Sequence, residues 1–170
     1  MRRTDRYRIV VVLALLVVLH FSVRSRLGDE RVAPDFLLLA LLLYTIRAQP
    51  GRAAAAGFIV GLLRDALSPA SFGAGALAHT LVGYFSASAK SVFFAENVLV
   101  NAWIIFVATW VRNLIVSLAS GHLTGGELGW ELFGWELLVW SPLQSFTTAA
   151  AGVLVLVLLG RWMVVRVSRA

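Results

Sequence analysis

The sequence predicts an all-α membrane protein, a bundle of about six transmembrane helices that form one domain over residues 1–170. Two observations predict this class. Hydrophobic residues make up 59% of the chain and charged residues only 14%, whereas about a quarter of a soluble domain is charged. The hydrophobic residues also come in long blocks, and not as a stripe every 3.6 residues, which is typical of helices whose outer faces meet lipid. Such a chain lacks the polar surface that a soluble domain needs.

Six hydrophobic blocks define the expected spans. They cover approximately residues 9–23, 34–48, 53–67, 74–89, 97–119 and 137–165. The first block follows four arginines and no cleavage site comes after it, so we expect an uncleaved helix and not a signal peptide. Pro34 suits the first turn of the second helix, and Gln49-Pro50-Gly51 forces the turn that ends it.

The later blocks are separated by polar segments. Residues 68–73 indicate a turn between the third and fourth helices. Between the fifth and sixth, residues 121–136 carry Glu127, Glu131 and Glu136 with Trp130 and Trp135 among them. That spacing suits the membrane interface, or a short amphipathic segment lying on the membrane. Several blocks are shorter than the roughly 20 residues that cross a bilayer. Five spans, with the second and third helices as a re-entrant hairpin, therefore stay open.

The distribution of lysines and arginines predicts how the chain is oriented in the membrane. The net charge is +6, but the basic residues lie mostly in short connecting segments and at the chain ends, so they do not indicate nucleic acid. With six spans and the N-terminus inside, ten basic residues fall on the cytoplasmic side and three outside. We therefore expect a multi-pass membrane protein with both termini cytoplasmic.

The sequence contains no residue pattern that indicates an enzyme or a metal site. The chain has no cysteine, which excludes disulfides, thiol nucleophiles and thiolate metal ligands. Histidines and carboxylates are scattered, and no Gly-x-Ser-x-Gly nucleophile setting occurs. We expect no catalytic residue, no metal and no cofactor.

The third block contains the most unusual feature, since Arg64 and Asp65 stand side by side within it. A charge at depth in a bilayer is costly and is a functional-site hypothesis by default. A helical rise of about 1.5 Å per residue places Asp65 in the outer half of the membrane. The same estimate places an intramembrane polar cluster there, formed by His79, Arg112 and Gln144, with His20 in the same layer. We expect Asp65 to pair with Arg112, and Arg64 to reach the outer surface or join the network.

Small residues precede these charges. Gly57, Gly61, Arg64 and Ser68 follow a spacing that puts them on one helix face. Glycines there let another backbone approach closely and cover the charges with protein. Helix packing and a partner or ligand site are both consistent with this pattern.

The run from Pro34 to Gly73 resembles a known family. Pro34-Asp35-Phe36 opens an apolar helix, and after a basic turn come residues 57–63 (GFIVGLL), Asp65, Ser68 and Phe72-Gly73. This pattern, over about forty residues, is similar to MreD, the small integral membrane component of the bacterial rod-shape machinery. The candidate partner-binding or helix-packing residues are Gly57, Gly61, Arg64, Asp65, Ser68, Pro69, Phe72 and Gly73.

The resemblance implies a non-enzymatic scaffold of the bacterial inner (cytoplasmic) membrane. Its expected partners are MreC, the glycosyltransferase RodA with its class B penicillin-binding protein, MreB and membrane lipid. Together they direct lateral-wall peptidoglycan synthesis. The family is thought similar in fold to the substrate-binding subunits of energy-coupling-factor vitamin transporters. The alternative function is therefore such a subunit, with the outer-half cluster as a pocket for a small molecule.

Overall fold

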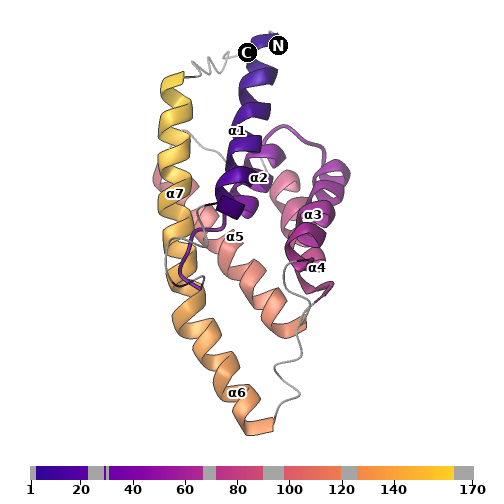
Figure 1. Ribbon diagram of the computed structural model, residues 1–170, viewed down its shortest axis with the longest axis vertical. Coiled ribbons are helices and arrows are strands. Elements are labelled where there is room, and N and C mark those ends of the chain that lie inside the picture. The colour runs from indigo at the N-terminus through magenta and orange to yellow at the C-terminus, as the bar shows by residue number, and fades with distance from the viewer. Residues whose placement is uncertain are drawn as a thin grey trace.

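The chain folds as a bundle of helices in the computed structural model (Figure 1). The structure describes residues 3–22, 29, 31–66, 72–89, 98–119 and 126–162, and no strand occurs within these ranges. Five helices are separate: α1 (Arg3–Ser22), α2 (Phe36–Thr45), α3 (Pro50–Asp65), α4 (Ala74–Ser88) and α5 (Val98–Ala119). The sixth helical segment is continuous and comprises α6 (Gly126–Trp135), the π-helical turn η4 (Glu136–Trp140) and α7 (Ser141–Trp162). The predicted all-α fold with about six helices is confirmed.

Two helices in the described part of the chain are long and apolar enough to cross a membrane. They are α5, over Val98–Ala119, and the stretch Gly129–Leu158 of the last segment. In Figure 1 the start of α1 and the end of α7 lie at the same end of the molecule, and α6 lies at the opposite end. The two long helices pack against each other and α4 packs on α5, whereas α3 packs mainly on α4 and α1 mainly on α2.

Helix α2 lies at the centre of the bundle and is shorter than the predicted block at 34–48. Its ten residues rise about 15 Å, half the hydrocarbon thickness, so α2 cannot span a bilayer by itself. Leucines 37, 38, 39, 41 and 42 are all at most 2% exposed. All of them except Leu37 form one cluster with Leu16 of α1, Val82 of α4, Ile105 of α5 and Ala149 of α7. Protein therefore covers most of this apolar helix, while Tyr44 near its end is exposed.

Helices α3 and α4 form a closely packed hairpin. A Cβ on Gly57 would overlap the backbone carbonyl of His79, and one on Gly61 would overlap the backbone of Ala76. In the other direction, a Cβ on Gly83 would come 2.6 Å from the Ala53 carbonyl oxygen. Glycine is thus required on both helices, because only backbone without a side chain lets them approach this closely.

The last helical segment begins earlier than predicted. Residues 126–136 were expected in a loop or a segment lying on the membrane, but α6 continues through η4 into α7 (Figure 1). Pro142 lies just after η4 and has no N–H to donate to the carbonyl four residues earlier. The wider π-helical turn is a common response to such an interruption, and Ser141 N–H donates instead to the Glu136 carbonyl.

Candidate functional site

A buried carboxylate, Asp35, is the centre of the polar site. Its side chain is 0% exposed. Its Oδ2 pairs with Nη1 of Arg64 from α3 and lies 3.1 Å from Nη2 of Arg112 from α5. Its Oδ1 lies 3.7 Å from Nδ1 of His20 from α1. One carboxylate therefore joins side chains from three different helices.

Local sequence explains how Asp35 reaches this position. It is the N-cap of α2, and its Oδ1 accepts a hydrogen bond of 3.1 Å from the Leu38 N–H. Its own N–H donates to Oγ1 of Thr148 on α7 at 3.1 Å. Thr147 donates to the Val32 carbonyl at 2.6 Å, so α7 holds the segment that precedes α2 inside the bundle.

Amide side chains extend the network toward α7. Arg112 donates through Nη1 to the Asn113 side-chain oxygen. Asn113 donates to Oε1 of Gln144 at 3.0 Å, and Gln144 donates to the Ala33 carbonyl at 3.2 Å. Because Arg112 and Gln144 are 2% and 5% exposed, these bonds lie in the protein interior, where hydrogen bonds to charged groups are strongest.

Asp65 has a different partner from the one that we expected. Its two oxygens accept hydrogen bonds from the N–H groups of Gly73, Gly75 and Ala76, at 2.9, 3.0 and 2.9 Å. These N–H groups lie at the start of α4 and have no carbonyl partner within the helix. The helix dipole also favours a negative charge there. The predicted Asp65–Arg112 pair is therefore wrong, because Arg112 pairs with Asp35 and Asp65 caps α4.

This geometry gives a testable result for Asp65→Ala. We expect the free energy of unfolding to fall by about 1–3 kcal/mol, since buried backbone donors lose a charged acceptor. Thermal unfolding of the purified chain in detergent measures the change. A charge swap between Asp65 and Arg112 is expected to give no rescue, and a swapped variant as stable as the unchanged chain would contradict this assignment.

The structure places the other predicted site residues in three settings. Gly57 and Gly61 are covered by α4, as described above. Phe72 is exposed and Gly73 starts α4 with a φ of 97°, a conformation that glycine adopts readily. His79 is buried on α4, with Nδ1 2.8 Å from the Gly75 carbonyl oxygen and no partner at Nε2. Ser68 and Pro69 lie outside the described residues.

Sequence reasoning missed Asp35, Asn113 and Thr148. A signal for Asp35 existed, because Arg64 and Arg112 both fall deep in predicted spans with only Asp65 to balance them, and Asp35 stands at the start of the second block. With Asp35 counted, two aspartates balance Arg64 and Arg112. Within the described ranges, no three His, Asp or Glu side chains form a group that could hold a metal ion. The chemistry of the cluster is thus charge compensation between helices.

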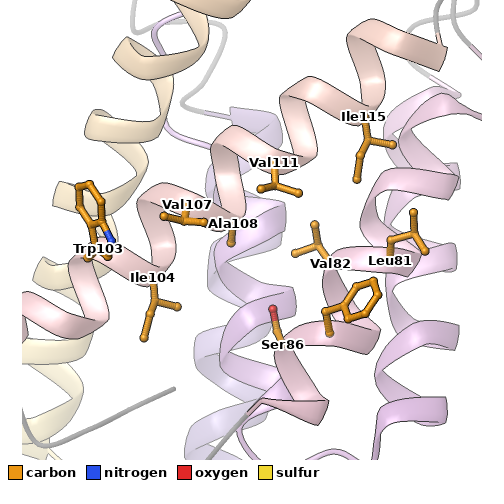
Figure 2. A pocket seen from close by; sticks show the side chains of 10 residues that line it. Leu81, Val82, Ser86, Trp103, Ile104, Val107, Ala108, Val111 and Ile115 are labelled. Atoms are coloured by element: carbon orange, nitrogen blue, oxygen red, sulfur yellow. The ribbon is translucent and has the colours of Figure 1, made fainter. Parts of the chain in front are cut away.

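An apolar groove of about 400 Å³ lies between α4 and α5 (Figure 2). Figure 2 shows Val111 and Ile115 of α5 facing Val82 and Leu81 of α4 across the space between the helices, with Trp103 at the edge of the group. The larger lining side chains are Leu81, Val82, Phe85, Trp103, Ile104, Val107, Val111 and Ile115. Ser86 and Ala108 supply small surfaces to the groove.

The fold and the site together define a class: a helical protein with membrane-spanning character, whose interior charges hold its helices together. The model of the family described as rod shape-determining protein MreD matches residues 1–160. The chain belongs to the MreD family, which is membrane-associated and is known for determining cell shape and not for catalysis. No curated protein and no solved structure matches the chain.

Proposed function

We propose that the chain is a non-enzymatic scaffold of the bacterial inner membrane that binds MreC. Through this contact it helps to organise RodA, its class B penicillin-binding protein and MreB during peptidoglycan synthesis. The observation that carries the proposal is the apolar groove between α4 and α5, which we assign to the transmembrane helix of MreC. Membership of a shape-determining family supports a role in the machinery that determines cell shape.

The chemistry of the groove suits a helix that crosses the membrane. Its walls are almost entirely apolar, and it runs along α5, a helix of 22 residues that is long enough to span. Trp103 and Phe85 at its rim are 67% and 63% exposed, so they are available to a partner. Small side chains at Ser86 and Ala108 allow a second helix to approach closely. A helix placed in a groove is a common mode of recognition.

The glycine face of α3 is less suitable for MreC. Gly57 and Gly61 already pack against the α4 backbone, so the motif stabilises the chain itself. The charge cluster is also occupied by contacts within the chain, because Asp35 and Asp65 both have partners there. A vitamin-like ligand would have to displace these bonds, and we therefore favour the scaffold over the transporter subunit.

Filling the groove is expected to weaken MreC binding. In Val107→Trp, a large side chain enters the groove from a position that is 40% exposed, so the fold tolerates it. We expect the amount of MreC that co-purifies to fall roughly tenfold, equivalent to about 1.4 kcal/mol. The matched control is Val157→Trp on α7, at a position that is 44% exposed and outside the groove.

Crosslinking provides a second measurement. The chain contains no cysteine, so single cysteines at Ile104, Val107 or Leu154 can be paired with cysteines along the MreC helix without background. We expect disulfides from Ile104 and Val107 and none from Leu154. Normal MreC binding by Val107→Trp, together with crosslinks confined to Leu154, would overturn the assignment of the groove.

A further inference from the structure

The surface of α6 and η4 carries exposed apolar side chains next to carboxylates. We define it by Trp130, Glu131, Leu132, Trp135, Glu136 and Leu138, and name it the α6 surface. Trp130, Leu132, Trp135 and Leu138 are 59%, 54%, 57% and 74% exposed. Glu131, Trp135 and Leu138 follow an i, i+4, i+7 spacing, so they share one helix face. The α6 surface is separate from the groove between α4 and α5.

The helix that carries this surface is too long to lie within a bilayer. From Gly126 to Trp162 it measures about 55 Å at 1.5 Å per residue. The hydrocarbon core is about 30 Å thick, and membrane helices rarely tilt by more than about 40°. Even at that tilt the core accommodates only about 40 Å of helix. At least one end must therefore project beyond the core.

The structure indicates which end projects. In Figure 1, α6 extends beyond the ends of the other helices. The guanidinium of Arg31 lies 5.4 Å from the centre of the Trp140 ring, and Arg31 belongs to a polar turn with Asp29. Tryptophan and arginine together are typical of the membrane–water interface. With Trp140 at the interface, the α6 surface lies outside the membrane on the side of the α1–α2 connection.

The negative charge of the α6 surface indicates the kind of partner that binds it. Exposed aromatic and aliphatic side chains in water indicate a binding site. Glu131 and Glu136 lie among them, and no lysine or arginine occurs between Asn113 and Gly160. An anionic lipid surface attracts basic helices and is repelled by acidic ones. The complementary partner is thus a protein helix with apolar residues flanked by lysine or arginine.

We propose that the α6 surface binds a basic amphipathic helix of a partner protein, just outside the membrane. Its apolar residues cover Trp130, Trp135 and Leu138, and its cations pair with Glu131 and Glu136. The site differs from the groove that we assign to MreC, so either proposal can fail while the other stands.

The test uses the full-length chain in cells that contain its native partners. A photo-crosslinking amino acid replaces Leu132 or Leu138 on the α6 surface, or Leu154 on α7 as the control. Crosslinked peptides are identified by mass spectrometry. We expect adducts from positions 132 and 138 to map to one segment with lysine or arginine at helical spacing beside apolar residues, and no such adduct from position 154.

Charge reversal then tests the electrostatic part. The double variant Glu131→Lys/Glu136→Lys is expected to lower the yield of the α6 adduct roughly tenfold, because it places like charges opposite each other. Thermal unfolding of the purified double variant in detergent serves as the folding control and should match that of the unchanged chain. Adducts to lipid, to a second copy of the chain or to a segment without basic residues would overturn the proposal, as would an adduct yield unchanged by charge reversal.

Discussion

Replacing Asp35 by asparagine is expected to lower the free energy of unfolding by about 3–5 kcal/mol, because it leaves two arginines without their shared carboxylate. An unpaired Arg112 contributes most of this loss, since it is 2% exposed and cannot reach water without moving α5. Asparagine is a good N-cap, so Asp35→Asn retains the start of α2 and removes only the charge.

Thermal unfolding of the purified chain in detergent measures this effect. The matched control is Asp29→Asn, at an exposed aspartate whose Oδ1 accepts a hydrogen bond from the Arg31 N–H; we expect a change within about 0.5 kcal/mol. Arg64→Met should cost less than Arg112→Met, because Arg64 is 20% exposed and its site retains access to water. Equal unfolding temperatures for Asp35→Asn and Asp29→Asn would contradict the central role of Asp35.

The helical fold could be predicted from the sequence because apolar blocks and their polar breaks are local signals. Their exact bounds could not. Helix α2 is short because Asp35 caps it inside the bundle, and that cap depends on Thr148, 113 residues away. Residues 126–135 form α6, which continues into η4, and η4 contacts α5, with Trp110 Nε1 donating to the Leu137 carbonyl at 3.3 Å. Glycines at positions 126, 129 and 134 obscure this helix in the sequence, since glycine lowers helix propensity.

The layer of the polar site could be predicted, but its pairing could not. Helical rise predicted one layer for Arg112, Gln144 and His20; the structure brings Arg112 and His20 to Asp35 and joins Gln144 to them through Asn113. Rise does not give the direction in which each helix faces, which depends on packing. Asp65 had suitable depth for Arg112, yet the backbone donors of α4 lie closer to it along the chain. Because the N–H groups at the start of α4 bind Asp65, Arg112 pairs with Asp35 and not with Asp65.

A side chain at position 61 is expected to separate α3 from α4. In Gly61→Ala the new Cβ would overlap the backbone of Ala76 and the carbonyl of Gly75, and backbone cannot rotate away as a flexible side chain can. We expect a loss of about 1–3 kcal/mol for the single methyl group, and more for Gly61→Leu. Circular dichroism during heating gives the unfolding temperature of each variant.

Gly51 of the same helix provides the matched control, because nothing lies within 4 Å of a Cβ built there. Gly51→Ala is expected to be neutral or to stabilise by up to about 1 kcal/mol, since alanine favours a helix. If Gly61→Ala behaved like Gly51→Ala, the close approach of the two helices would be refuted. Helix α4 also forms one wall of the groove, so Gly61→Leu should lower crosslinking from Ile104 to MreC as well as stability. Loss of both would link the glycine motif to partner binding through the position of α4, without direct contact between the motif and the partner.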